Sequence, residues 1–352
     1  MVNVPRRIDR DRARGCLLGL AIGDALGATL EFTRPPQLNF RDLIRGPHVD
    51  IIGGGPFHVP PYGTTDDTAM AACLVSSLAE RSRLDVEDVA ARYTRWAVDA
   101  PDVGNQTGEV LGRVRAGVPA AEAAAKVWNE KAPRPAGNGA LMRTAPIGVA
   151  FALRPLEELA MAAADEAAIT HWDPRCQLAS AALDAAIAAA LTSGKALKPD
   201  DMLQAAFDSQ PHARARAVER NPESSLVVAA GADIDSDLRS ATADDPALNA
   251  PDLHLHEHMG FVRVAFRLAF WELFHAPTFE AALVDVVNRG GDTDTNGAIT
   301  GALLGAFMGE SAIPQRWSGP MLRAHVNKAS EGPTDLETLL ALADRCAERG
   351  GL

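Results

Sequence analysis

Aromatic residues and strand-forming runs are scarce in this 352-residue sequence, in which Phe, Trp and Tyr make up only 5% of the residues. Runs of Val, Ile, Tyr and Thr are few, whereas alanine, leucine and arginine, which favour helix, are plentiful. The scarcity argues against a sheet-based fold. Because 47% of the residues are hydrophobic, the chain can bury a sizeable core. The composition therefore predicts an all-α protein.

The sequence is also short of positive charge and of long hydrophobic runs. Its net charge of -12 argues against nucleic acid as a general ligand and suits a protein that binds cations. No uncharged apolar run reaches the ~20 residues of a membrane span. The arginine-rich start followed by "CLLGLAIG" imitates a signal peptide, but Asp24 interrupts the apolar run. We therefore expect a cytoplasmic protein that does not insert into a membrane.

Cysteine is rare as well, and its spacing indicates no disulfide framework. Three of the four cysteines lie within apolar helical runs, which is typical of buried free thiols in a reducing compartment. The four positions are Cys16, Cys73, Cys176 and Cys346.

Helical periodicity is distributed over nearly the whole chain, with short Pro- and Gly-marked loops between helices. We find no composition shift and no fixed-period repeat, so we predict one domain over residues 1–352, built as an orthogonal helical bundle. Residues 35–63 are expected to form a long loop, and residues 210–257 a surface excursion with little helix. Helices are expected at about 11–28, 65–80, 85–99, 107–116, 119–131, 139–152, 156–168, 174–193, 199–208, 258–275, 278–288, 295–309 and 334–348.

Glycine, in contrast, recurs every fourth position in two distant helical segments. Each glycine inside a helix costs roughly 1 kcal/mol relative to alanine, so such a row needs a compensating role. Residues four apart share one face of a helix, and glycine there allows close backbone approach. We therefore predict that both segments carry a close-packing glycine face. The rows are Gly15, Gly19, Gly23 and Gly27, and Gly297, Gly301, Gly305 and Gly309.

Two acidic clusters stand at the starts of predicted helices: "TTDDT" at 64–68 and "GGDTDTN" at 290–296. Each alone is consistent with ordinary capping and helix-dipole interactions. Together they offer four carboxylates and two hydroxyls, the ligand set of a hard divalent cation. The absence of His and Cys from both clusters favours Mg²⁺ or Mn²⁺ over zinc. The sequence predicts a site for two such ions, with Thr65, Asp66 and Asp67 facing Asp292, Asp294 and Thr295.

These clusters occur within a longer series of motifs that resembles the ADP-ribosylglycohydrolase family. The series comprises "GCLLGLAIGDALGATLEF", "GTTDDTAMA", "DVGNQT", "GNGALMRTAPIG", "ITHWDPRC" and "VVNRGGDTDTNGAITGALLGA", spanning residues 15–306. The resemblance implies an all-α fold with a dinuclear Mg or Mn centre that holds the distal ribose of ADP-ribose. It also implies that the six residues of the two clusters are the metal ligands.

The resemblance further implies roles for two carboxylates outside the clusters. Glu31 matches a glutamate that lies beside the metals, and Asp102 matches an aspartate proposed to act as acid or base. Cleavage of a glycosidic bond needs one group to assist the leaving atom and another to activate water. We therefore expect Glu31 and Asp102 to be catalytic. Local sequence alone is equally consistent with a solvated glutamate and a turn aspartate.

Candidate substrate-binding residues lie in glycine-rich turns and at helix starts, where free backbone N–H groups can bind phosphate. Arg143 is a candidate charge partner or a structural residue, and His171 matches a histidine near the ribose and phosphates. Phe261 occupies a position where the family often has tyrosine, which keeps a stacking face and loses a hydrogen bond. The expected substrate-binding set is Gly104, Asn105, Asn138, Gly139, His171 and Phe261.

The sequence thus predicts a metal-dependent hydrolase that releases ADP-ribose from a modified acceptor, with protein arginine as the first expectation. O-linked serine, O-acetyl-ADP-ribose and a modified nucleic acid are alternative substrates, and a non-catalytic ADP-ribose-binding or crystallin-like member of the fold is a different class of alternative. The expected partner is an ADP-ribosylated protein or a small ADP-ribosyl conjugate. "HLHEH" at 254–258 is interpreted as a polar surface stretch and not as a zinc site.

Overall fold

The computed structural model describes residues 7–36, 43–221, 223–324 and 331–349. Within these ranges it contains fifteen α-helices and, apart from two isolated bridges, no β-structure, which confirms the all-α prediction. The α-helices are α1 (Arg10–Gly27), α2 (Asp66–Arg81), α3 (Val86–Asp99), α4 (Asn105–Arg115), α5 (Ala120–Glu130), α6 (Ala145–Ala150), α7 (Leu156–Ala167), α8 (Pro174–Thr192), α9 (Pro199–Arg220), α10 (Ser224–Arg239), α11 (Val262–His275), α12 (Phe279–Asn288), α13 (Thr293–Met308), α14 (Gln315–Met321) and α15 (Leu336–Arg349).

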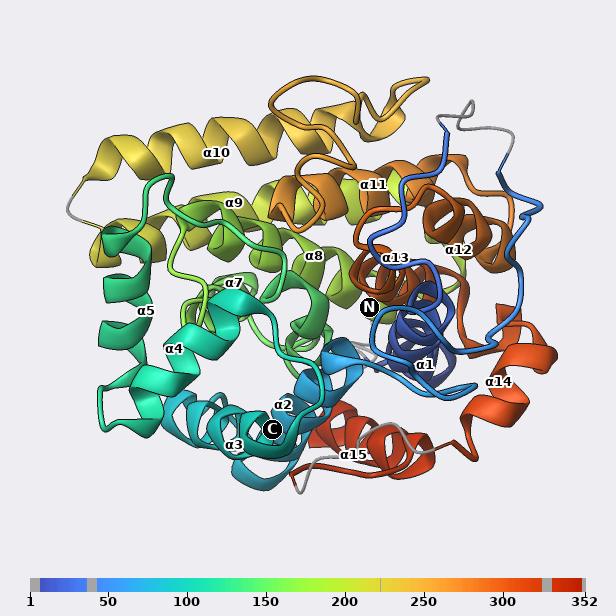
Figure 1. Cartoon of the computed structure of the whole chain (residues 1–352), viewed down its shortest axis with the longest axis horizontal. Coiled ribbons are helices and arrows are strands. Elements are labelled where there is room, and N and C mark those ends of the chain that lie inside the picture. Colours follow the sequence, from blue (N-terminus) through green and yellow to red (C-terminus); the bar gives the residue numbers. More distant parts are fainter. Residues whose placement is uncertain (1–6, 37–42, 222, 325–330, 350–352) are drawn as a thin grey trace, which may run out of the picture.

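Helices α1 and α13 lie side by side near the middle of the molecule (Figure 1). They run antiparallel, because Gly15 of α1 lies against Gly305 near the end of α13 and Gly27 lies against Thr293 at its start. The packing is so close that a Cβ atom on Gly19 would come within 2.1 Å of the Gly301 carbonyl oxygen. The predicted glycine faces are confirmed, and they meet each other.

One large core of buried side chains extends through α1, α2, α8, α11 and α13. The carbonyl end of α1 and the amino end of α13 lie at the same end of the central pair. The turn that follows α1 and the loop that precedes α13 are joined there by Phe32 N–H, which donates to Gly291 O at 2.7 Å, and Gly291 N–H, which donates to Thr33 O at 2.9 Å.

The prediction that residues 210–257 form a surface excursion with little helix is wrong for the first half of this range. Helix α9 continues to Arg220 through Pro211, and α10 follows it from Ser224. Both helices pack against α8, and their inward faces bury Ala213 and Ile234. From residue 243 to 257 the chain is irregular except for short turns, as expected, and the irregular stretch continues to residue 261, because α11 begins four residues later than the predicted 258. The weak apolar periodicity of these helices arises because alanine supplies much of their buried face.

The predicted 139–152 helix is divided into a 3-10 turn at Leu141–Arg143 and the short α6. Helix α14 was not expected from the sequence. Among the described helices, none combines the length and the apolar character needed to cross a membrane.

Candidate active site

The start of α2 is held in place by a carboxylate from another helix. Asp24 of α1 is fully buried and accepts hydrogen bonds from Thr65 N–H at 2.9 Å and Thr68 N–H at 3.1 Å. It also accepts from the Thr65 and Thr68 hydroxyls. Thr65 itself makes no side-chain cap of α2, so Asp24 satisfies the free backbone donors at this helix end. The Thr65 hydroxyl is thereby fixed, and its oxygen lies 3.1 Å from Asp67 Oδ2.

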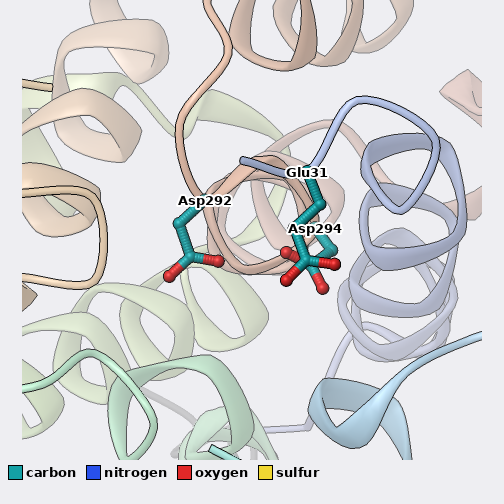
Figure 2. A group of neighbouring side chains, drawn as sticks. All are labelled: Glu31, Asp292 and Asp294. Carbon is teal, nitrogen blue, oxygen red and sulfur yellow. The ribbon is translucent and has the colours of Figure 1, made fainter. Parts of the chain in front are cut away.

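The two predicted acidic clusters meet at this point. The Thr295 hydroxyl of α13 lies 3.5 Å from Asp67 Oδ2, which links the start of α13 to the start of α2. Glu31 joins them from the turn after α1, and one carboxylate oxygen each of Glu31, Asp292 and Asp294 lie within 4.8 Å of one another. Figure 2 shows these three side chains grouped beside the start of α13. The structure therefore places Glu31 among the candidate ligand oxygens.

Within the described ranges, no lysine or arginine forms a salt bridge with the carboxylates of this cluster, and the Arg143 cation, which interacts electrostatically with Asp66, is paired with Glu166. Glu31 Oε2 and Asp67 Oδ1 are buried, and neither has a hydrogen-bond partner in the described part of the chain. Burial first, and then the neighbouring carboxylate of Asp292, raises the pKa of Glu31 to about 9. Burial and nearby carboxylates also raise the pKa values of Asp66, Asp67 and Asp294 well above the ordinary range. Unpaired buried oxygens in an all-oxygen donor set fit a hard divalent cation.

A cavity of about 620 Å³ opens beside this cluster, a volume within the usual range for small-molecule sites. Its wall combines carboxylates with glycine, amide and hydroxyl groups, and among the described residues no lysine or arginine lines it. Thr65 and Asp67 lie behind the wall, hydrogen-bonded to the cluster. The lining residues are Glu31, Phe32, Phe57, Asp66, Pro101, Asp102, Val103, Gly104, Asn105, Gln106, Thr107, Gly137, Asn138, Gly139, Met142, His171, Gly260, Asp292, Asp294 and Thr295.

The amino end of α4 forms part of the cavity wall. Gly104 is the N-cap of this helix, and the first residues, Asn105, Gln106 and Thr107, all line the cavity. Gly104 N–H lies 3.4 Å from Asp66 Oδ2, which ties the α4 start to the acidic cluster. Free backbone N–H groups at a helix start can bind phosphate. Gly104 and Asn105, two of the expected substrate-binding residues, thus line the cavity at this helix start.

The "GNG" turn packs on a buried histidine. His171 is 2% exposed, and its Nδ1 lies 2.8 Å from the Thr170 hydroxyl. Burial, with a smaller effect of the Arg143 cation, lowers the pKa of His171 to about 3, so the ring is neutral at physiological pH. A Cβ atom on Gly139 would lie 3.0 Å from His171 Cε1, and Gly137 is similarly close to the ring. Glycine there lets the backbone approach the ring.

Asn138 bridges this turn and the acidic cluster. Its side-chain amide donates to Asp292 Oδ2 at 2.9 Å, and its backbone N–H donates to Gly260 O at 2.9 Å. Asn138 therefore orients a candidate ligand as well as lining the cavity.

Asp102 lines the cavity from the loop before α4, separate from the Glu31, Asp292 and Asp294 cluster. Burial, followed by repulsion from Asp292, raises the pKa of Asp102 to about 6. A carboxyl group with a pKa near neutrality can both donate and accept a proton under physiological conditions.

Two candidate residues lie elsewhere. Phe261 is not part of the cavity wall: its ring lies beneath the Arg175 guanidinium, 5.2 Å from ring centroid to Cζ, so the expected substrate stacking has no support. Arg143 is fully buried, donates to Glu166 at 2.8 Å and lies over the Tyr93 ring. Of its two expected roles, these contacts favour the structural one over that of a charge partner for the substrate.

The "HLHEH" stretch forms no metal group with other residues in the described part of the chain. His256 Nε2 lies 2.7 Å from Arg289 O, and His258 Nε2 lies 2.9 Å from Pro251 O. His254 Nδ1 accepts from His256 N–H. These rings thus fix a loop through backbone contacts.

The sequence analysis did not identify Asp24, Phe32 or Phe57 as site residues. Asp24 had a visible signal, because an aspartate within the apolar run "GLAIGDALG" requires buried hydrogen-bond partners. The two phenylalanines lie in loop sequence that carries no periodic pattern.

Comparison with known proteins assigns these features to a family. The family model described as ADP-ribosylglycohydrolase matches residues 5–351. The chain is 31% identical to the ADP-ribosyl-[dinitrogen reductase] glycohydrolase of Rhodospirillum rubrum, over 95% of this chain and 97% of that protein. It is 29% identical to the ADP-ribosylarginine hydrolase Tri1 of Serratia proteamaculans, over 89% of this chain and 76% of that protein. A solved structure titled "ADP-ribosylglycohydrolase-related protein complex" matches with 31% identity and a TM-score of 0.68, over 97% of this chain and 99% of that chain.

Proposed function

The chain belongs to the ADP-ribosylglycohydrolase family, and from this premise we propose that it uses divalent cations to cleave the N-glycosidic bond between ADP-ribose and a protein arginine. The activity of an ADP-ribosyl glycohydrolase follows from the family and its relatives. Arginine as the acceptor is supported by the relative in Serratia proteamaculans, which is named an ADP-ribosylarginine hydrolase. The observation that carries the proposal is the convergence of carboxylates from four separate segments on one cavity, with buried oxygens left unpaired.

The proposed cation site consists of the six residues of the two acidic clusters: Thr65, Asp66, Asp67, Asp292, Asp294 and Thr295. Glu31 is an additional candidate ligand, because its carboxylate lies among those of Asp292 and Asp294. We assign two ions, Mg²⁺ or Mn²⁺, to this all-oxygen donor set. When bound, such ions orient the ribose diol and lower the pKa of a bound water molecule.

Other residues of the chain would bind the rest of the substrate. The start of α4, at Gly104 and Asn105, would bind the diphosphate; the Gly104 N–H is directed at Asp66, so the backbone N–H groups that follow it in α4 would make the contact. Asn138 and Gly139 would form the opposite wall, and neutral His171 would support it without adding charge. This arrangement directs the distal ribose toward the acidic cluster.

Hydrolysis breaks the bond between the anomeric carbon and the acceptor nitrogen. The oxygen of water bonds to the anomeric carbon, one water proton ends on the leaving nitrogen, and the other remains on the new hydroxyl group. Asp102, with its pKa near 6, is the group we assign to accept and return the transferred proton. Glu31, on the cluster side of the cavity, is the second carboxylate able to exchange a proton there.

The test is to incubate the protein with arginine-linked and serine-linked ADP-ribosyl peptides and with O-acetyl-ADP-ribose. Released ADP-ribose is measured by mass spectrometry with Mg²⁺, with Mn²⁺ and after EDTA. We expect release from the arginine conjugate that EDTA abolishes. Release from only the O-linked conjugates would reject the arginine assignment, and full activity in EDTA would reject the cation site.

The cation ligands are tested by Asp294→Ala, with Asp200→Ala on the exposed start of α9 as the control. We expect Asp294→Ala to lose cation binding and more than about 100-fold of activity together, since loss of even supporting groups costs 10–100-fold. Wild-type turnover in this variant would show that the ligand assignment is wrong.

A further inference from the structure

Two exposed aromatic side chains stand at the mouth of the cavity, next to the acidic cluster. Phe32 is 52% exposed and Phe57 is 36% exposed, and they are the only aromatic residues among the exposed large hydrophobic side chains of the described ranges. Both line the cavity. Their rings form an edge-to-face pair with centroids 6.4 Å apart. Exposed aromatic surface at a binding cavity is a signal of recognition.

The backbone holds this pair in position. Phe32 adopts a left-handed conformation with φ of 61°, which costs a non-glycine residue roughly 1–2 kcal/mol. Its N–H donates to Gly291 O at 2.7 Å, so the turn is tied to the segment that carries Asp292. Strained residues of this kind persist where the surrounding structure enforces them, and they cluster at functional sites.

Phe57 projects from a tight turn that is fastened to the same region. Gly54 and Val59 close the turn by two backbone hydrogen bonds of 2.7 and 2.9 Å. Gly55 packs directly on the end of α1, because a Cβ atom there would lie 1.9 Å from Ala28 O. The Thr29 hydroxyl also donates to Gly53 O at 3.0 Å. The two rings are therefore preorganised relative to each other and to Glu31.

Their location identifies which part of the substrate they meet. Phe32 follows Glu31 directly, and Glu31 lies in the cluster that would hold the distal ribose. The start of α4 and the turn around His171, assigned above to the diphosphate side, come from other segments of the wall. The acceptor is attached to the distal ribose, so it leaves the cavity past Phe32 and Phe57.

The charge of the cavity wall indicates which kind of acceptor group fits beside the two rings. In the part of the chain that the structure describes, the cavity wall contains five carboxylates and no lysine or arginine, and buried Asp67 adds a sixth carboxylate to the site. When fully ionised, these six groups carry more negative charge than two divalent ions would neutralise. A cation that approaches the aromatic faces is attracted by the ring quadrupoles, and a planar guanidinium also stacks on them. We infer that Phe32 and Phe57 form the docking site for the guanidinium and alkyl stem of the ADP-ribosylated arginine, an inference that rests on the proposed function.

Kinetics of Phe57→Leu and Phe32→Leu on the arginine-linked peptide test this site, since leucine keeps apolar bulk and removes the ring face. We expect each variant to raise KM by about 3- to 30-fold, the range of a cation–π contact, with kcat changed by less than about twofold. Phe57→Trp should retain the wild-type KM. The affinity for free ADP-ribose, measured by calorimetry, should stay within about twofold of wild type. Val228→Ala, at an exposed apolar position on α10, is the surface control.

Two results would overturn the inference. An equal loss of affinity for free ADP-ribose would show that the rings stack on the nucleotide, and an unchanged KM would show that they contact no part of the acceptor. The proposed function fails differently, because the unaltered enzyme would then release no ADP-ribose from the arginine conjugate.

Discussion

Replacing the Asp24 carboxylate by an amide tests how far one buried side chain controls the cation site. Asp24→Asn retains one acceptor oxygen and removes the charge that receives four hydrogen bonds from Thr65 and Thr68. We expect a 10- to 100-fold loss of Mn²⁺ affinity, because residues that orient ligands affect affinity to that extent. Isothermal titration calorimetry measures the affinity, and thermal unfolding is recorded in parallel.

The matched control is Asp11→Asn, which alters an exposed aspartate on the same helix that accepts from Ser311. It should leave Mn²⁺ affinity unchanged. If Asp24→Asn lowers the melting temperature but binds Mn²⁺ as wild type does, Asp24 is a helix cap without influence on the ligands.

The individual ligand candidates could be predicted from sequence because each lies in a short motif whose residue types suit one chemistry. The role of Asp24 could not, since it depends on a contact between positions 24 and 65 that local sequence does not specify. Phe261 is the opposite case. A motif position suggested a stacking role, but the ring packs under Arg175 outside the cavity wall.

The backbones of α1 and α13 pack directly on each other at their glycines, so this helix pair leaves no room for added side-chain atoms. We expect Gly19→Ala to destabilise the protein by about 3 kcal/mol or more, because its methyl group would lie 2.1 Å from the Gly301 carbonyl and the backbones would have to separate. Urea unfolding monitored by circular dichroism gives the free energy of unfolding.

Gly112→Ala serves as the control for this helix test. Gly112 lies on α4, and a methyl group added there would meet no atom within 4 Å, so alanine should stabilise the protein by about 0.5–1 kcal/mol. A neutral effect of Gly19→Ala would contradict the close packing of the two helices.

The glycine spacing made this helix pair predictable, whereas the part of α9 beyond the predicted 199–208 and the whole of α10 were missed. Their sequences carry many charges and an internal Pro211, and their buried contacts include small residues such as Ala213, Ala217 and Ala230. Alanine contributes little to an apolar periodicity. Tertiary packing against α8 therefore decides a helical state that the local pattern indicates only weakly.

For the whole molecule, we expect stability without divalent cations to decrease as the pH rises. Divalent cations should counteract this decrease. Burial raises the pKa of Glu31 to about 9 and that of Asp102 to about 6, so the folded protein binds more protons than the unfolded chain above pH 4.5. Stability in EDTA should thus fall as pH rises from about 5 to 9. Saturating Mn²⁺ should raise the melting temperature most at the alkaline end, because it binds the ionised carboxylates of the folded state.

Differential scanning calorimetry at several pH values, with EDTA and with Mn²⁺, measures this dependence. Glu31→Gln should flatten the decline in EDTA, since it removes the group with the widest titration window. A melting temperature in EDTA that rises between pH 5 and 9 would contradict the proposed environment of the cluster.

The all-α class and the meeting of the two acidic clusters could thus be anticipated from the sequence. The shape of the cavity could not, because it depends on how loops from residues 28–33, 53–59, 101–107 and 137–139 are positioned by helices distant in the chain. No periodic pattern in the sequence specifies where these segments lie relative to one another.

The pairing of the first helix with the thirteenth has a consequence for biosynthesis. Asp24 and Glu31 are made early, but Asp292 and Asp294 follow more than 250 residues later, a delay on the order of tens of seconds at ribosomal speed. Until then the glycine face of α1 has no helix to pack against. A nascent chain of three-quarters length contains only half of the proposed cation ligands. Activity should therefore arise late and all at once, when α13 leaves the ribosome and docks.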